Sequence, residues 1–356
     1  PREERLRLGP SLEDIPMPTH PFPRPLGRLE TFTISSPNIA QNLLGDPGER
    51  VVTVYVSEGA DEVEGGVPLL VDLVGFTGSG FSHVGWKCYD ENVPQRVDRL
   101  QAEGRLGPCV VALPDCFTSL GGNQYINSVA MGRWADFLIE DLIPELESRF
   151  PVRPGREHRG CFGKSSGGYG SLIHGMRYAS SWGAVACHSG DMGFDRVYLR
   201  DFPAACDALN RWDGVEGFLR HFGETQTVAG SELHVMMVLA MAATYDPDPN
   251  APRGVRLPVD TRTCVLDEEA WERWLKHDPV RILEERSAQE NLASLRGLYI
   301  DCGSRDQYYI HYGTRQLVDR LQQLGINHRY DEFDGTHSGI NHRMDESLPF
   351  LYAALS

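Results

Sequence analysis

Two adjacent serines lie in the glycine-rich stretch "RGCFGKSSGGYGS". The spacing Gly163-x-Ser165-x-Gly167 is typical of a nucleophile elbow, in which a reactive serine sits on a sharp turn between a strand and a helix. Ser166 lacks this pattern, because Lys164 stands two residues before it. We therefore predict that Ser165 is a nucleophile, and that Ser166 contributes its backbone N–H to an oxyanion hole.

The same stretch contains Gly-Lys-Ser, which could end a phosphate-binding loop. That loop has the pattern G-x-x-x-x-G-K-[S/T], and the chain has His158 where its first glycine would stand. Starting the pattern at Gly155 places Gly160 correctly, but no lysine follows it. Nucleotide binding is therefore disfavoured, while a glycine-rich turn without chemistry stays open until partners for the serine are found.

A serine hydroxyl needs a base, and the base needs a carboxylate that orients it. In folds with a nucleophile elbow these groups follow in the order serine, acid, histidine, each on a loop after a strand. Asp306 follows the apolar run "LYIDCG", and His337 follows "YDEFDG". The order predicts that Asp306 is the acid and His337 the base for Ser165.

Other acids and histidines fit these roles less well. Asp301 lies within a predicted strand, and Asp334 lies in the turn before His337. His342 begins the last predicted helix. His174 and His188 precede the acid in the chain, which is the wrong order for the base.

The second oxyanion donor should come from the loop after the third strand. The segment "LVGFTGSG" (73–80) fits, and its glycines would let the backbone approach a substrate. We expect the donor to be the N–H of Phe76. Trp86 on the same side and Lys164 beside the nucleophile are candidate substrate-binding residues, although Trp86 could equally be a packed core aromatic.

These residues must be positioned by a sheet. Continuous apolar runs at 68–76, 109–115 and 183–190 are typical of strands buried on both faces of a parallel sheet. Helical spacing at 131–146 and 314–325 falls between and after them. This alternation predicts an α/β fold, with a mostly parallel central sheet and helices on both faces.

The chain divides into three parts by composition. Residues 1–27 are rich in proline and are expected to form an extended arm. Residues 28–194 and 291–356 carry the strand and helix alternation of the core. Residues 195–290 lack buried strands and contain several helical patterns, so we expect a helical cap insertion that shapes the pocket.

The composition of the chain argues against several classes of protein. The net charge of −16, without a basic cluster, argues against nucleic-acid binding. No apolar stretch is long enough for a membrane span. The eight cysteines match no zinc pattern and are expected to be reduced thiols, although their even number leaves disulfides open. We expect a cytoplasmic location; the chain starts without Met, so a removed leader stays open.

The segments "VPLLVDLVGFTGSG", "GKSSGGYGSLIHGMRY" and "DGTHSGINHR" together resemble the putative esterase family of α/β-hydrolases. This group includes S-formylglutathione hydrolases, feruloyl esterases, enterochelin esterases and mycolyltransferases. The resemblance runs from about residue 28 to the end, outside 195–290. Two departures concern the pocket: Val74 stands where the family often has histidine, and Lys164 and Ser166 flank the nucleophile where histidine and methionine are frequent.

Motif and resemblance lead to one hypothesis. The chain is expected to be a serine esterase that cleaves a small-molecule carboxylic ester through an acyl-enzyme, without cofactor or metal. The same groups could serve an acyltransferase, thioesterase or amidase. A non-catalytic binding protein on a hydrolase fold is the alternative from another class, and a homo-oligomer is compatible with each.

Overall fold

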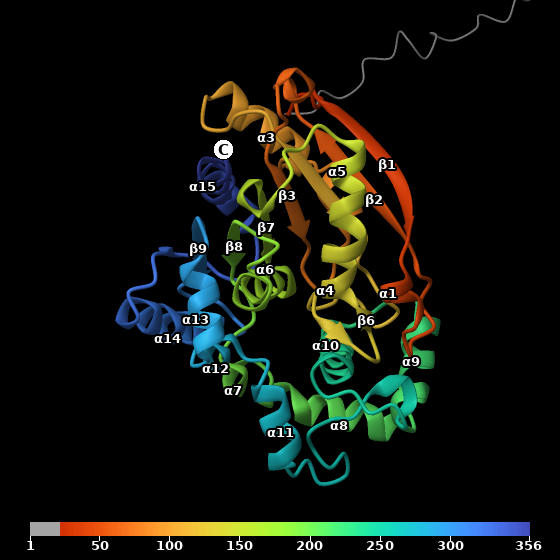
Figure 1. Cartoon of the computed structure of the whole chain (residues 1–356). Coiled ribbons are helices and arrows are strands. Elements are labelled where there is room, and N and C mark those ends of the chain that lie inside the picture. Colours follow the sequence, from red (N-terminus) through yellow and green to blue (C-terminus); the bar gives the residue numbers. More distant parts are fainter. Residues whose placement is uncertain (1–21) are drawn as a thin grey trace, which may run out of the picture.

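The computed structural model describes residues 22–356, so most of the predicted N-terminal arm lies outside the described residues. Eight strands form the central sheet, in the order β1-β2-β4-β3-β7-β8-β9-β10 (Figure 1). The first two pairings, β1 with β2 and β2 with β4, are antiparallel, and the remaining pairings are parallel. The strands are β1 (Arg28–Ser35), β2 (Glu49–Val56), β3 (Leu69–Leu73), β4 (Val110–Pro114), β7 (Arg159–Lys164), β8 (Ala184–His188), β9 (Gly297–Gly303) and β10 (Arg329–Phe333).

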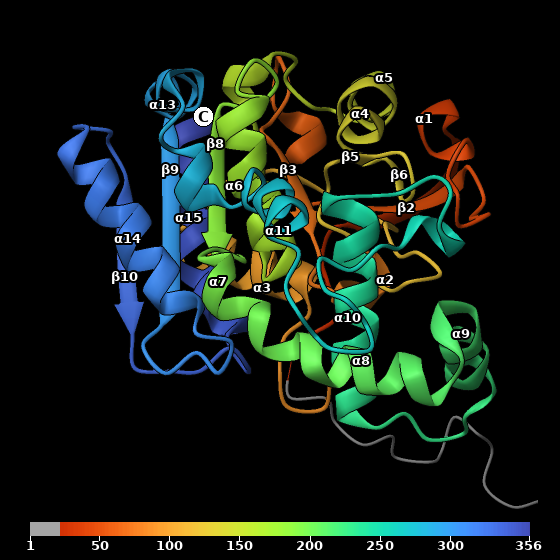
Figure 2. The same cartoon turned by 90° about the horizontal axis from the view of Figure 1, so that it is seen from below.

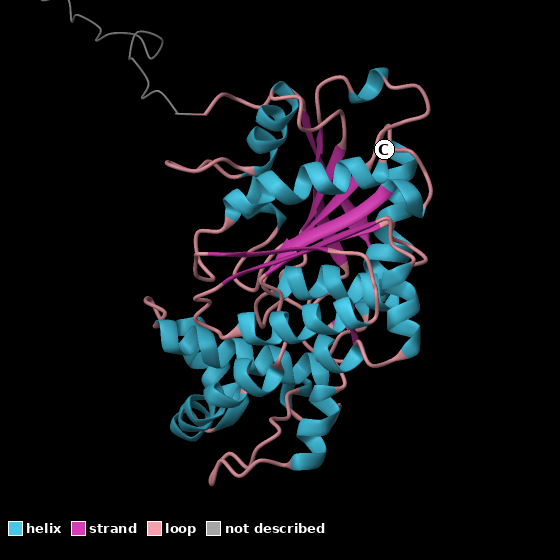
Figure 3. Ribbon diagram, turned by 90° about the vertical axis from the view of Figure 1, so that its left-hand side faces the viewer, coloured by secondary structure: helices cyan, strands magenta, loops and turns pink. Residues whose placement is uncertain are grey.

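The inner strands are apolar along their whole length because both faces of the sheet are covered. Every residue of β3, β4, β8 and β9 is buried. Alternate residues point to opposite faces, so Val71 and Leu70 belong to two separate hydrophobic clusters. The predicted fold class, a mostly parallel sheet between helices, is confirmed (Figure 3).

Each face has its own helices. The larger cluster, which contains Val71, packs beneath α5 (Ile143–Arg149), α6 (Ser166–Arg177) and α14 (Ile310–Gln323). The smaller cluster, which contains Leu70, packs against α3 (Val93–Ala102) and α15 (Met344–Leu355). The predicted nucleophile elbow, between β7 and α6, therefore lies in the middle of a sheet whose two faces are both covered by helices.

The helix predicted over 131–146 begins later than expected. Met131 lies just before β6 (Gly132–Arg133), which pairs with β5 (Asn127–Ser128) in a small ribbon. Gly132, the first residue of β6, has φ of 106°, a backbone conformation that lies outside the helical region. The helical turns then run from Trp134, with a π-helical stretch at Phe137–Leu142.

Residues after β8 form helices that extend beyond one end of the sheet. In Figures 1 and 2, α8, α9, α10 and α11 gather there, below the carboxyl end of β3 in the first view. By contrast, α13 packs against α6, which is one of the helices that cover the sheet. The helices of this region are α7 (Phe194–Val197), α8 (Phe202–Arg211), α9 (Gly214–Glu224), α10 (Gly230–Tyr245), α11 (Glu268–Leu275), α12 (Pro279–Ile282) and α13 (Arg286–Ala293).

The described residues contain no membrane-spanning helix, no cluster of metal-binding side chains and no disulfide. No helix within residues 22–356 combines the length and apolar character that a membrane crossing requires. The same residues hold no group of three or more His, Cys, Asp or Glu side chains placed to bind a metal ion. All eight cysteines are free thiols, and six of them are buried.

His174, which is buried, and His277, which is partly buried, should make folding sensitive to acid. His174 on α6 lies 2.9 Å from the carbonyl oxygen of Tyr125 through Nε2, and its Nδ1 accepts a hydrogen bond from Trp182, so the ring is held neutral. Burial lowers the pKa of His174 to about 4, and burial lowers the pKa of His277 to about 4 as well. Between the ordinary value of 6.5 and about 4, the unfolded chain takes up these protons and the folded chain does not.

We therefore expect the free energy of unfolding to fall as pH drops through this range, by about 3 kcal/mol for each histidine. Urea unfolding at a series of pH values measures this slope. His174→Gln should reduce the slope, whereas His342→Gln at an exposed position should not. An unchanged slope in His174→Gln would show that the ring is charged in the folded protein.

Candidate active site

Ser165 occupies the turn between β7 and α6 in a conformation that few residues adopt. Its φ is 57° and its ψ is −123°, which is strained for a residue with a side chain. The backbone on both sides is held: its N–H donates to the carbonyl of His188 (3.0 Å), and its carbonyl accepts from the N–H of Tyr169 (2.8 Å). The strain is therefore maintained by β8 and by the first turn of α6.

The two glycines of the motif remove side chains where strand and helix approach each other. A Cβ on Gly167 would lie 1.7 Å from the carbonyl oxygen of Leu73 on β3, and a Cβ on Gly163 would lie 2.2 Å from the same atom. Real Cβ atoms do not approach backbone oxygens so closely. The glycines are thus required by the packing of β3, β7 and α6 around the serine.

Gly167→Ala should destabilise the protein by about 1–3 kcal/mol or prevent folding, because the added methyl group overlaps backbone that cannot move freely. Gly223→Ala on α9 is the matched control, since a Cβ there meets nothing within 4 Å. It should be neutral or slightly stabilising, because alanine favours helix. Thermal unfolding of both variants tests this, and equal melting temperatures would contradict the steric account.

The loop after β3 lies against the elbow. A Cβ on Gly75 would sit 3.6 Å from the Cβ of Ser165, so the backbone of this loop reaches the serine. The carbonyl of Val74 accepts a hydrogen bond from the Tyr125 hydroxyl (2.5 Å), and the carbonyl of Phe76 accepts one from the N–H of Gly122 (2.7 Å). The loop that carries the predicted Phe76 donor is therefore anchored beside the predicted nucleophile.

Asp306 and His337 lie on neighbouring loops and contact each other. Nδ1 of His337 is 2.7 Å from Oδ2 of Asp306, and these side chains come from the loops after β9 and β10. Asp306 is 1% exposed, and its other oxygen accepts from the N–H of Tyr308 (2.8 Å). The backbone N–H of His337 donates to the side-chain oxygen of Gln307 (2.9 Å). The imidazole ring of His337 contacts Asp306 through Nδ1, so Nε2 is not bonded to this carboxylate.

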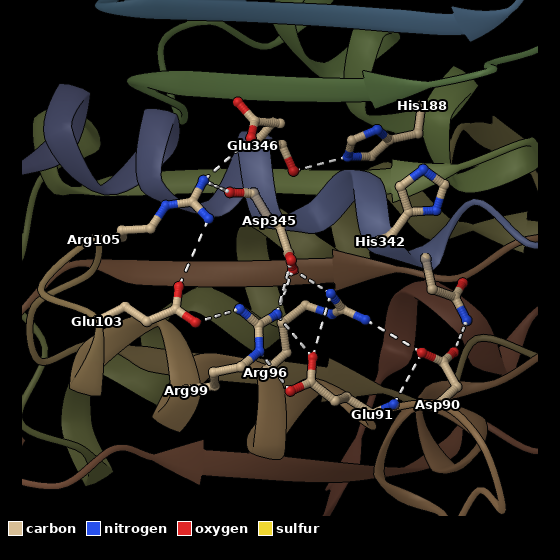
Figure 4. Close-up of polar contacts among 12 residues, drawn as sticks. Asp90, Glu91, Arg96, Arg99, Glu103, Arg105, His188, His342, Asp345 and Glu346 are labelled. Carbon is tan, nitrogen blue, oxygen red and sulfur yellow. Dashed lines mark hydrogen bonds and ion pairs between the residues drawn. The ribbon is translucent and has the colours of Figure 1, made fainter. Parts of the chain in front are cut away.

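The loop that carries His337 is also tied down on its far side. Asn341 donates to a carboxylate oxygen of Asp90 (2.7 Å), which joins this loop to the segment before α3. Next to this contact, Arg99 of α3 binds both carboxylate oxygens of Asp345 (2.8 Å each), and the buried Arg96 pairs with the same carboxylate (Figure 4). The network connects α3 to the start of α15 and limits movement of the histidine loop.

These groups open onto one cavity of about 560 Å³. Its wall includes Ser165, Phe76, His337 and Lys164, together with residues of α10. Trp86 is not among the lining residues and is 73% exposed. The structure therefore places four of the seven predicted site residues on the cavity wall. Ser166 follows Ser165 directly and Asp306 is bonded to His337, so six of the seven lie together, and Trp86 lies outside.

The competing acids and histidines are engaged elsewhere. Asp301 is bonded to His188 (2.9 Å) and to Arg343 (2.9 Å) within the buried sheet face. Asp334 is an exposed residue whose side chain is 85% accessible and pairs with Arg305. His342 is exposed, with Nδ1 3.2 Å from the Gly339 carbonyl. None of these contacts involves Ser165.

Sequence analysis missed several polar groups of the cavity, among them two carboxylates. Asp191, after β8, accepts hydrogen bonds from Gln124 (2.9 Å) and Tyr198 (3.0 Å), and burial raises its pKa. Asp72 on β3 lies 2.5 Å from Nδ1 of His83, and its other oxygen is buried without a partner among the described residues. Asp191 stands directly after the apolar run "GAVACHSG", and this position at a strand end was a signal that could have identified it.

Comparisons with known proteins identify the family of the chain. The sequence matches the family described as "Putative esterase" over residues 123–344. No curated protein matches the chain significantly in sequence.

Several solved structures share the fold. One described as a ferulic acid esterase has a TM-score of 0.60 at 17% identity, with 94% of this chain and all of that chain covered. An S-formylglutathione hydrolase from Staphylococcus aureus has a TM-score of 0.54 at 12% identity, covering 92% and 99%. One from Agrobacterium tumefaciens has the same TM-score at 16% identity, covering 93% and 96%.

The family match spans well over half of the chain, and it includes the elbow and both the Asp306 and His337 loops. The structural neighbours, at these low identities, establish the α/β-hydrolase fold. The chain accordingly belongs to the putative esterase family and is a carboxylic ester hydrolase of the α/β-hydrolase fold.

Proposed function

We propose that the protein hydrolyses a small-molecule carboxylic ester with Ser165, His337 and Asp306 as its catalytic triad. The observation that carries this proposal is the 2.7 Å contact of His337 with the buried Asp306, in a cavity whose wall also holds the strained Ser165. A serine hydroxyl needs a base to take its proton at neutral pH, and the elbow conformation exposes the hydroxyl at the turn.

The roles follow from the contacts. Asp306 accepts from the Nδ1–H of His337, which leaves Nε2 as the proton acceptor. Ser165 Oγ attacks the ester carbonyl while its proton passes to Nε2. The negative charge that develops on the carbonyl oxygen is stabilised by the N–H groups of Phe76 and Ser166. The N–H of Ser166 is in the first turn of α6, where no acceptor exists within the helix.

Two steps complete the cycle. The tetrahedral intermediate expels the alcohol, which receives the proton from His337, and the acyl group stays on Ser165 as an ester. Water then gives a proton to the same nitrogen and attacks the acyl carbon. Expulsion of Ser165 with that proton releases the carboxylic acid and restores the enzyme. Atoms and charges balance without a cofactor.

The helices beyond the sheet are proposed to act as a cap over this cavity. Leu233, His234 and Met237 of α10 line its wall, so the cap would contact the acyl or alcohol part of the substrate. Transfer to an alcohol other than water, or cleavage of a thioester or amide, would use the same groups.

Pre-steady-state kinetics with p-nitrophenyl acetate tests the acyl-enzyme. We expect a burst of p-nitrophenol equal to the enzyme concentration, and a protein mass increased by one acetyl group after acid quenching. Release of p-nitrophenol without a covalent intermediate would reject the nucleophilic mechanism. No release from any ester in a panel of short acyl and hydroxycinnamoyl esters would favour a non-catalytic binding protein.

A further inference from the structure

Lysine is rare in this chain, and most of its few lysines lie at the candidate active site. There are three lysines, Lys87, Lys164 and Lys276, among 34 Lys and Arg residues. Two of the three, Lys87 and Lys164, line the active-site cavity, while Lys276 is exposed after α11. Arginine makes most of the ion pairs elsewhere, as the α3–α15 network illustrates. The use of lysine rather than arginine at the cavity therefore suggests a role that is specific to this site.

Lys164 is the last residue of β7 and immediately precedes Ser165. It is paired in register with His188 on β8, and it follows Phe162 by two residues, so its side chain lies on the sheet face covered by α15. Phe162, His188 and Met344 line the cavity on this side. The ammonium group thus faces the cavity close to the nucleophile.

This ammonium group is partly removed from water and has no counter-ion among the described residues. Burial lowers the pKa of Lys164, and the carboxylate that opposes this effect is Asp306, which is itself bonded to His337. Among residues 22–356, the side chain of Lys164 forms no hydrogen bond or ion pair. Two carboxylates line the cavity, and both are bonded to other groups: Asp72 to His83, and Asp191 to Gln124 and Tyr198. Asp306, which is not a lining residue, is bonded to His337.

Moving the Lys164 ammonium group partly out of water without an ion-pair partner is unfavourable, and a bound anion would offset this cost. We propose that Lys164 binds a carboxylate of the substrate, so that the enzyme prefers anionic esters. This inference rests on the proposed function of the same site. Lys87, whose ammonium lies 3.6 Å from Asp90, adds a second positive charge on the cavity wall.

The position of Lys164 limits where the carboxylate can be. Its backbone is adjacent to the nucleophile, and a lysine side chain extends by only four methylene groups. The carboxylate must therefore lie a few bonds from the scissile carbonyl. Monoesters of short dicarboxylic acids place it on the acyl side, and acyl esters of 2-hydroxy acids place it on the alcohol side.

Matched ester pairs test the proposal. The acyl-side pair is monoethyl succinate and its neutral amide, ethyl succinamate; the alcohol-side pair is O-acetyl-lactate and O-acetyl-lactamide. We expect the wild-type kcat/KM to favour the anionic member of at least one pair by roughly tenfold to a hundredfold, the effect of one charge-assisted hydrogen bond. The ratio within one enzyme preparation is insensitive to the fraction folded.

Lys164→Met should bring this ratio close to about one, Lys164→Glu should invert it, and Lys164→Arg should restore part of it. Lys276→Met is the control for removal of a distant charge, and it should keep the wild-type ratio. A wild-type preference for the neutral esters, which the carboxylates of Asp72 and Asp191 would produce if they dominated, would overturn the inference. Equal loss of the ratio in Lys276→Met would also overturn it.

Binding without turnover separates this inference from the proposed function. Ser165→Ala should bind monoethyl succinate or O-acetyl-lactate more tightly than the neutral amide, by calorimetry, and the additional Lys164→Met change should remove the difference. Equal binding of both members in both pairs would reject the role of Lys164 even if the wild type is an active esterase. Selective binding by a protein that hydrolyses no ester would reject the proposed function alone.

Discussion

Ser165→Ala is expected to lower kcat for ester hydrolysis by roughly ten-thousandfold to a millionfold. The variant loses the only atom that forms the acyl-enzyme, while the oxyanion donors and the cavity stay. Alanine at this position also keeps the backbone strain at φ of 57°, so the elbow should be preserved. Steady-state kinetics with p-nitrophenyl acetate, with circular dichroism to confirm folding, measures the effect.

Ser166→Ala is the matched control, because it changes the neighbouring serine on the same turn. Its proposed role uses the main-chain N–H, which alanine retains. The side chain loses only a contact of 3.2 Å with Gln124, so we expect a loss in kcat of less than about tenfold. An inactive Ser166→Ala together with an active Ser165→Ala would reverse the assignment of the nucleophile.

Asp306→Asn is expected to lower kcat by roughly ten-thousandfold, with a much smaller change in KM. The asparagine amide would donate to Nδ1 of His337, which places the imidazole proton on Nε2 and removes the base from Ser165. The substitution keeps the size of the side chain in a fully buried position, so packing should change little. A large fall in kcat with little change in KM would distinguish this effect from general destabilisation of the fold.

Asp334→Asn provides the comparison, because Asp334 precedes His337 closely in the chain but points to solvent and pairs with Arg305. We expect its kcat to stay within about twofold of the wild type, as surface ion pairs contribute little. If Asp334→Asn were the inactive variant, the acid of the triad would have to be reassigned and the loop after β10 would have to rearrange.

The fold could be predicted because its signals are local. Strands that are buried on both faces require continuous apolar runs, and β3, β4 and β8 have them. The elbow also has a local signal, since Gly163 and Gly167 are required by the approach of β3 to the turn. Asp306 and His337 could be paired because each follows a strand at the same sheet edge, where the structure now places them 2.7 Å apart.

Other features depend on packing that no local pattern encodes. Asp191 is held by Gln124 and by Tyr198, which directly follows α7, so its place in the cavity depends on how segments far apart in the sequence pack together. The missing counter-ion of Lys164 is likewise a property of the assembled cavity. Trp86 shows the reverse case: its type suggested a pocket wall, whereas the structure leaves it largely exposed outside the lining.

Labelling with a fluorophosphonate probe tests the triad most directly, because the reaction requires an activated serine and no knowledge of the natural ester. We predict one adduct per chain on Ser165 by peptide mass spectrometry, with labelling lost in Ser165→Ala, retained in Ser166→Ala and strongly slowed in Asp306→Asn. An adduct on Ser166, or folded wild-type protein that is not labelled, would contradict the assignment of Ser165 as the nucleophile.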